Sequence, residues 1–338
     1  MGNVSIDLSL ANLWRSWQLF RRGKKSSSDI DQFAYNLESN LLRLWQDLDD
    51  GSYRHGGYRK FIVADNKRRE ISVASVCDRV VHRLLYEYLV KIYDKTFIYD
   101  AWSCRKGKGV VGAINRTQNF LLCFKNSFVW RSDIVKFFDN VDTGLLFEIL
   151  CRKIKEDKAL RLLKEVIESF LVQGPAGMQR ERERESKGPR RGIPIGNLTS
   201  QIFANIYLNE FDRFVKHQLK PQAYLRYGDD FIIINDTKVK VNQVRLEAIK
   251  FLFENLKMQT HQKSDIIVAC RQGLKFLGTE IFSNGRRLKK RNWHRAISRL
   301  NHHNLGSYWG LIKQHNFKKI KQFNWIVKNY LYEDTRRL

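Results

Sequence analysis

Apolar residues recur every three to four positions across 8–50, which predicts amphipathic helices joined by a basic polar loop near 21–29. Two short β-prone runs then flank Asp65 and Asn66, and this pattern predicts a hairpin over 58–74. Helical spacing returns at 76–92. The sequence SCRKGKG follows as a glycine-spaced basic loop that leads into another helix.

The rest of the chain mixes strands and helices without regular alternation. A run rich in Phe, Val and Ile at 128–134 predicts a strand, and helical patterns occupy 143–170, 198–219 and 241–256. Further β runs surround the tetrapeptide YGDD and the tripeptide FLG, and the chain from about Arg286 onward is expected to be basic and helical. This order predicts an α+β fold.

One segment departs from these patterns. Between Gly174 and Gly192 the chain has no apolar period and alternates Arg with Glu, so we expect an exposed insertion at 174–191.

Composition narrows the class of partner. The 338 residues include 61 Lys and Arg against 35 Asp and Glu, a formal charge of +26, and 12% are aromatic. The aromatic content excludes a disordered basic tail, and the charge favours a polyanionic partner. Nucleic acid is the first candidate. An anionic membrane surface is the second, although no stretch approaches the roughly 20 apolar residues of a transmembrane helix.

The five cysteines are widely spaced and include no CxxC pair. A disulfide framework or a zinc site is therefore not expected, and the cysteines are interpreted as buried small hydrophobic residues in a reducing cytosol.

The candidate chemistry lies in three acidic residues. Asp229 and Asp230 sit at the turn of YGDD between two β runs, and Asp133 ends a hydrophobic strand. Two or three carboxylates together with substrate phosphates are sufficient to hold Mg²⁺. Two such ions, roughly 3.5–4 Å apart, would activate an attacking oxygen and stabilise a leaving one.

The chain carries, in this order, a strand acid, a Gly-polar-Ser helix start, the YGDD hairpin, a lysine and an FLG turn. This series resembles the palm of a reverse transcriptase, from about Leu13 to His315. The resemblance implies a right-hand polymerase fold with fingers, palm and a short helical thumb. It also implies an RNA-directed DNA polymerase that uses two Mg²⁺ ions, with Mn²⁺ as a possible substitute. Asp133, Asp229 and Asp230 match the catalytic, metal-binding aspartates, and Phe138 matches the aromatic residue that blocks a ribose 2′-hydroxyl.

Further family positions follow from the same resemblance. Lys67, Arg69 and Arg105 match residues that hold the incoming triphosphate, and Lys263 matches a lysine that protonates the leaving pyrophosphate. Asp78 and Arg79 match a pair that we interpret as structural. The remaining matches are the primer grip and the positions that flank the nucleotide pocket: Phe276, Leu277 and Gly278, and Ile195, Gly196 and Gln201.

We expect four regions along the chain. They are an N-terminal helical extension at 1–50, fingers with the start of the palm at 51–132, a palm at 133–284, and a helical thumb at 285–338. The basic thumb residues are expected to bind the phosphates of a template–primer duplex without reading sequence.

The form I-G-x-x-x-S-Q, which begins at Ile195, resembles reverse transcriptases of diversity-generating retroelements rather than the Q-G-x-x-x-S-P form of group II introns. That resemblance implies error-prone copying of a template RNA. It also implies an RNA or DNA primer, dNTPs, a small basic accessory protein or self-oligomer, and a cytoplasmic location in a bacterial or phage context without a membrane partner. Two alternatives stay open: a defence-associated reverse transcriptase that copies a dedicated RNA, and a catalytically silent nucleic-acid-binding scaffold.

Overall fold

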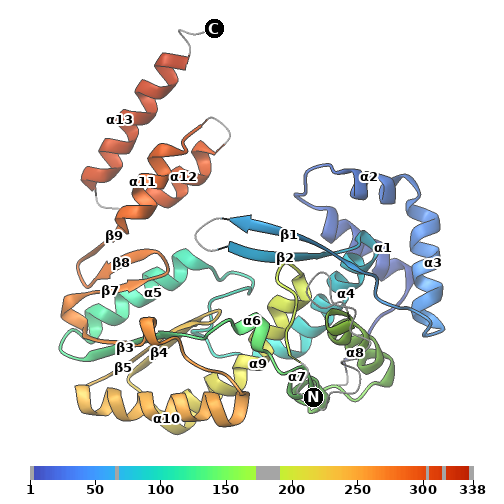
Figure 1. The fold of residues 1–338 in the computed structure, drawn as a ribbon, viewed down its shortest axis with the longest axis horizontal. Helices are drawn as coiled ribbons and strands as arrows, with labels where there is room; N and C mark the ends of the chain where they lie inside the picture. The colour runs from blue at the N-terminus through green and yellow to red at the C-terminus, as the bar shows by residue number, and fades with distance from the viewer. Residues whose placement is uncertain (1–3, 65–67, 173–190, 302–303, 314–316, 335–338) are drawn as a thin grey trace. The chain divides into compact units, whose positions relative to one another are not determined.

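The computed structural model describes residues 4–64, 68–172, 191–301, 304–313 and 317–334. The chain divides into two compact units, shown together in Figure 1. Unit 1 comprises Met1–Tyr99, Ile134–Leu219 and Glu247–His261, and unit 2 comprises Asp100–Asp133, Lys220–Leu246 and Gln262–Leu338. The Arg/Glu-rich insertion predicted at 174–191 lies, except for Arg191, outside the described residues.

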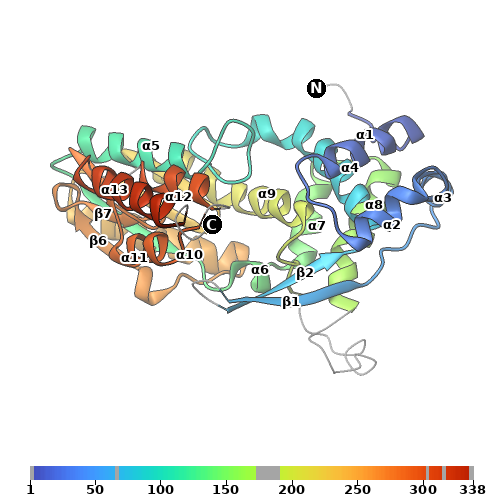
Figure 2. The ribbon, with the colours of Figure 1, turned by 90° about the horizontal axis from the view of Figure 1, so that it is seen from above.

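Unit 1 is largely helical, as the N-terminal periodicity predicts. Its principal helices are α1 (Leu10–Arg21), α2 (Ser28–Tyr35), α3 (Leu37–Asp49), α4 (Val76–Tyr93), α6 (Phe137–Asn140), α7 (Thr143–Cys151), α8 (Asp157–Val172) and α9 (Leu198–Phe214). Helix α1 packs on α4, which also packs on α9, so α4 is central to this unit (Figure 2). Ser75 caps α4 by accepting from the Asp78 amide, which satisfies one of the N–H groups that a helix start leaves free.

The predicted hairpin is confirmed as β1 (Tyr58–Ala64) and β2 (Arg68–Ala74), an antiparallel ribbon in which Val63 pairs with Arg69. A short π-helix, Val215–Leu219, continues α9.

Unit 2 is built on a four-stranded antiparallel sheet in the order β4-β5-β3-β6. Its strands are β3 (Phe128–Asp133), β4 (Ala223–Tyr227), β5 (Asp230–Asn235) and β6 (Ile266–Ala269). Val129, Leu225 and Ile232 share one face of the sheet and belong to a core cluster that includes Ile114 and Phe120 of α5 (Val110–Cys123). On the other face, the Trp130 indole donates to Asp265, as does Arg245 of α10 (Lys238–Leu256).

A second, three-stranded sheet follows in unit 2, with β7 (Leu274–Phe276), β8 (Thr279–Phe282) and β9 (Gly285–Leu288). The helical prediction from Arg286 onward is wrong at its start, because Arg286 and Arg287 pair with Ile281 and Glu280 in a β-ladder. Helices begin after this strand as α11 (Lys290–Ser298), α12 (Leu305–Ile312) and α13 (Phe317–Asp334). They share an apolar cluster with Trp293 and Phe323 buried in it.

Candidate active site

Two of the predicted aspartates face each other across neighbouring strands. Asp133, the last residue of β3, is directly opposite Asp230, the first residue of β5. Side chains alternate along a strand, so Asp133 and Asp230 project to the same face as Val129 and Ile232. That face is apolar in the middle of the sheet and acidic at its end. The hydrophobic core thus positions the acids at the edge of the face covered by α5.

Asp229 is one of the two residues of the turn that joins β4 to β5. Tyr227 pairs with Asp230, which leaves Gly228 and Asp229 as a two-residue hairpin loop. Gly228 has a φ of +64°, the conformation that glycine adopts at the first position of a type II′ hairpin turn. The fully buried Arg226 donates to the Gly228 carbonyl at 3.0 Å and so supports the turn from behind.

The two facing carboxylates differ in their partners. Asp230 accepts from Nη2 of Arg131 at 3.0 Å, whereas Oδ1 of Asp133 is buried and has no hydrogen-bond partner in the described part of the chain. Burial raises the pKa of Asp230 against the opposing effect of Arg131, and the nearby negative charge of Asp133 raises it further. A buried, unsatisfied carboxylate oxygen is costly, so Asp133 is suited to an added cation or donor.

Arg131 and Lys289 complete the charges around Asp230. Arg131 stands two residues before Asp133 on β3 and therefore shares its face. Burial and the charge of Arg131 lower the pKa of Lys289, while Asp230 acts in the opposite direction. Sequence reasoning missed Arg131 as a site residue, although its spacing from Asp133 was the signal that could have identified it.

Three further predicted site regions lie in unit 2. Arg105 lies in the segment beside β4, in which Ala101 forms an isolated β-bridge with Arg226. The Arg105 guanidinium donates to the Ala101 carbonyl at 3.2 Å. Lys263 is exposed in the single 3₁₀ turn Gln262–Ser264, shortly before β6.

The predicted primer grip is also in unit 2. Phe276 is buried in the core cluster, and Leu277 and Gly278 form the β7–β8 turn with φ of +46° and +77°. The Gly278 carbonyl accepts from Asn292 at 3.0 Å, and a Cβ at Gly278 would lie 2.8 Å from Nδ2 of Asn292. The positive φ therefore favours glycine at this position, and a Cβ would also displace the Asn292 amide.

The remaining predicted residues lie in unit 1, except that Lys67 falls outside the described residues. Arg69 is exposed on β2. The Ile195 carbonyl accepts from the Ser72 amide of the same strand at 2.9 Å, and a Cβ at Gly196, which has a φ of +115°, would lie 2.7 Å from Ile71.

Phe138 of α6 joins this group through its carbonyl, which accepts from the Ile193 amide at 2.8 Å. Gln201 is exposed on α9. Unit 1 thus brings the segment from Ile193 to Gly196 together with β2 on one side and the Phe138 backbone on the other.

Neither a preformed cluster of metal ligands nor a membrane-spanning helix occurs in the described part of the chain. No group of three or more His, Cys, Asp or Glu within that part of the chain is arranged to hold a metal ion. Asp133 and Asp230 lie face to face across the strands, and Asp229 directly precedes Asp230 in the β4–β5 turn. None of the described helices combines the length and apolar character that a transmembrane span requires.

The family model described as "Reverse transcriptase (RNA-dependent DNA polymerase)" matches residues 59–281, about two thirds of the chain. The chain belongs to this family. The predicted class of enzyme, an RNA-directed DNA polymerase, is confirmed at the level of this family.

Curated relatives are similar along much of the chain. Protein YkfC of Escherichia coli is 25% identical over 279 residues, covering 72% of this chain and 70% of its own length. The group II intron-encoded protein LtrA of Lactococcus lactis is 23% identical over 326 residues, covering 77% of this chain and 53% of its own length. The chain thus spans about half of LtrA.

Among solved structures, apo telomerase from Candida tropicalis matches with a TM-score of 0.50 and 12% identity, covering 77% of this chain and 51% of that chain. At this identity the likeness concerns the fold alone. Together with the family match and the mixed helix and sheet content, it confirms the predicted α+β polymerase fold.

Proposed function

We propose that this chain copies an RNA template into cDNA by two-metal nucleotidyl transfer, with Asp133, Asp229 and Asp230 as its metal-binding and catalytic residues. The observation that carries the proposal is the cross-strand pair of Asp133 and Asp230, with a buried, unpartnered carboxylate oxygen on Asp133. A hard cation takes carboxylate oxygens, and Mg²⁺ keeps waters and binds substrate phosphates as well, so these residues fit it. Bound Mg²⁺, or Mn²⁺ in its place, would stabilise the charge that develops on the reacting oxygens.

The chain's own residues hold and orient the reactants. Arg131 fixes Asp230 by an ion pair, so this carboxylate keeps one orientation while the Asp133 oxygen stays available. Arg105 and Arg69, together with Lys67, would bind triphosphate oxygens, because guanidinium and ammonium groups suit phosphate. Lys263 would donate a proton to the leaving pyrophosphate, and Phe138 would exclude a ribose 2′-hydroxyl.

Primer extension on an RNA template with Mg²⁺ tests this assignment. Asp229→Ala should abolish extension, because it removes a carboxylate from the β4–β5 turn. Asp236→Ala is the matched control, since Asp236 is an acid just beyond β5 whose ion pair with Lys240 is solvent-exposed. Extension by Asp229→Ala at the control rate would overturn the site assignment.

For the biological role, we infer an error-prone enzyme of the diversity-generating retroelement type. Support comes from Ile195, which stands where group II intron enzymes carry an amide, and from Gln201, which stands where they carry proline. An apolar side chain beside the nucleotide pocket removes hydrogen bonds that could discriminate matched from mismatched base pairs. A template RNA, a primer, dNTPs and a small basic accessory protein or a second copy would be the partners, in the cytoplasm of a bacterium or phage-infected cell.

Ile195→Gln tests this role on an RNA template that contains adenines. Restoring an amide should lower misincorporation opposite adenine, measured by sequencing the cDNA. Errors opposite the other three bases serve as the internal control and should stay unchanged. An equal error rate at adenine in both proteins would contradict the inferred link. Sequencing the RNA that copurifies with the chain would separate a repeat-derived template from the dedicated RNA of a defence enzyme.

A further inference from the structure

A second candidate binding site lies in unit 1, in a pocket that none of the predicted functional residues lines. The pocket has a volume of about 590 Å³, within the usual range of small-molecule sites. Residues from the ends of α4, α7 and α9, the π-helix after α9 and Phe251 of α10 line it. We refer to it as the α9 pocket.

A buried amide marks the α9 pocket as incomplete. Asn209 lines the pocket and is 4% exposed, and its Oδ1 atom is buried without a hydrogen-bond partner among the described residues. Leaving such an acceptor unsatisfied is unfavourable, because its water hydrogen bonds have been lost without replacement. A rotation of the Asn209 amide that brings this oxygen to the pocket would let a ligand N–H or O–H satisfy it.

The charges of the α9 pocket favour an anion. Arg152, Lys153 and Arg213 line it, against a single carboxylate, Glu210, which accepts from Arg152 at 2.9 Å. Burial and the nearby charges of Arg213 and Lys95 lower the pKa of Lys153. Three cations that line one pocket create a positive electrostatic potential, which would attract a phosphate.

Aromatic rings are the third feature of the α9 pocket that suits a nucleotide. Phe214 and Phe251 both line the pocket and stack with ring centroids 4.1 Å apart and planes 13° apart. Flat aromatic surfaces of this kind stack with nucleobases without reading their sequence. Phe214 directly precedes the π-helix Val215–Leu219, which contributes His217 and Gln218 to the lining, and such irregular turns are frequent at functional sites.

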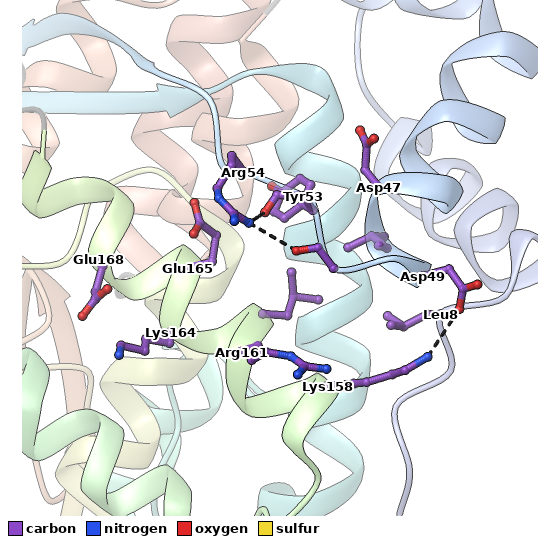
Figure 3. A pocket seen from close by; sticks show the side chains of 13 residues that line it. Leu8, Asp47, Asp49, Tyr53, Arg54, Lys158, Arg161, Lys164, Glu165 and Glu168 are labelled. Atoms are coloured by element: carbon purple, nitrogen blue, oxygen red, sulfur yellow. Dashed lines mark hydrogen bonds and ion pairs between the residues drawn. The ribbon is translucent and has the colours of Figure 1, made fainter.

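Another pocket of unit 1 lacks these features (Figure 3). Its charged lining residues are balanced: four acids, Asp47, Asp49, Glu165 and Glu168, and four bases, Arg54, Lys158, Arg161 and Lys164. Lys158 pairs with Asp49 at 3.3 Å, and no lining residue carries a buried, unpartnered side-chain atom within the described part of the chain. This balanced pocket therefore has no preference for an anion.

We propose that the α9 pocket binds a nucleoside phosphate unit, supplied either by single-stranded nucleic acid or by a free nucleotide. The cations would contact the phosphate, an aromatic ring would stack on the base, and Asn209 would accept a hydrogen bond from a base amine or a ribose hydroxyl. This binding is a property of unit 1 residues and does not require the polymerase chemistry of Asp133, Asp229 and Asp230.

Photo-crosslinking of the full chain tests the proposal. The probes are a single-stranded RNA of about 12 nucleotides that contains 4-thiouridine, a length within the range of single-strand sites, and 8-azido-AMP. Cross-linked peptides are identified by mass spectrometry in the Asp229→Ala background, so that the result is independent of catalysis. We expect adducts on the peptides that contain Phe214–His217 or Phe251.

Two variants and a control make the test decisive. Arg213→Glu, at an exposed position, should lower the yield of these adducts by about fivefold or more, because a phosphate contact becomes a repulsion. Asn209→Leu should lower it as well. Lys164→Glu makes the same charge change at the balanced pocket and should leave the yield unaltered.

The two probes distinguish the sources of the ligand. Adducts with RNA alone would assign the pocket to single-stranded nucleic acid, and adducts with 8-azido-AMP that unlabelled AMP competes away would assign it to a nucleotide. Absence of adducts on these peptides with either probe, or equal loss in Arg213→Glu and Lys164→Glu, would overturn the proposal.

Discussion

Asp78 of unit 1 and the pair Asp133 and Asp230 of unit 2 differ in how the surrounding residues compensate their carboxylates. In unit 1, Asp78 is 2% exposed and accepts from the Tyr53 hydroxyl and the Ser75 hydroxyl, each at 2.7 Å, and from the Gly56 amide at 3.3 Å. In unit 2, Asp133 keeps a buried oxygen without a partner, and Asp230 faces it across the strands.

The difference separates a carboxylate whose hydrogen bonds are satisfied within the fold from a pair of carboxylates that would gain from a bound cation. Three donors compensate the burial of Asp78, so its charge ties the chain before β1 to the start of α4. Two like charges face each other at Asp133 and Asp230, and one of them is only partly compensated by Arg131. The sheet therefore maintains a local instability that a bound cation would remove.

The largest effect should come from Asp133→Asn. We expect primer extension to fall by about a thousandfold or more, the loss of about 4 kcal/mol of transition-state stabilisation. Removing one of two facing negative charges should leave the free energy of unfolding unchanged or raise it slightly. Primer-extension kinetics and urea unfolding measure the two quantities, and a strongly destabilised variant would break the distinction between the two regions.

Asp78→Asn should show the reverse pattern. Replacing a buried charge that three donors surround should lower the free energy of unfolding by about 2–3 kcal/mol. Tyr53→Phe, which removes one of these donors, should lower it by about 1 kcal/mol. Primer extension per folded molecule should stay near the wild-type rate in both variants. Loss of activity in the absence of unfolding would place Asp78 in the catalytic machinery instead.

A smaller effect is expected on the pH dependence of the free energy of unfolding, through a buried histidine near Asp78. His82 is fully buried beside His55, and burial lowers its pKa to about 3. Because its unfolded pKa is near 6.5, the unfolded state takes up a proton first as the pH falls below that value. Stability should then decline by about 1.4 kcal/mol per pH unit, roughly 2 kcal/mol between pH 6.5 and pH 5.

Urea unfolding at several pH values measures this decline. His82→Gln should flatten it, and His217→Gln, at an exposed histidine, should leave it as in the wild type. An equal slope in His82→Gln and the wild type would show that other groups carry the acid sensitivity.

Local patterns in the sequence predicted much of the fold, whereas the family resemblance singled out the acids of the candidate site. The two β-prone runs around YGDD predicted its two strands, and the run that ends at Asp133 predicted a third. The error at Arg286 and Arg287 has a physical reason, since basic residues at a short edge strand carry no apolar period that separates them from a helix.

Partners set by tertiary pairing were harder to predict. The Arg131–Asp230 ion pair depends on the register between β3 and β5, strands about 100 residues apart in the chain, and the sequence contains no signal for that register. The α9 pocket likewise combines helices that are distant in sequence. Because such pairings leave no local pattern, the sequence identified single candidate residues in both units but not the distances between them.

The two-residue turn at Gly228 and Asp229 has a consequence for how this chain can vary. Strand pairing repeats every two residues, so one inserted or deleted residue that slipped β5 against β3 would turn Asp230 to the opposite face from Asp133. Substitutions in the apolar positions of these strands keep that parity, whereas a change of length does not. The length of this hairpin is therefore more constrained than the identity of its residues. Homologous chains should tolerate substitutions there far more readily than insertions or deletions.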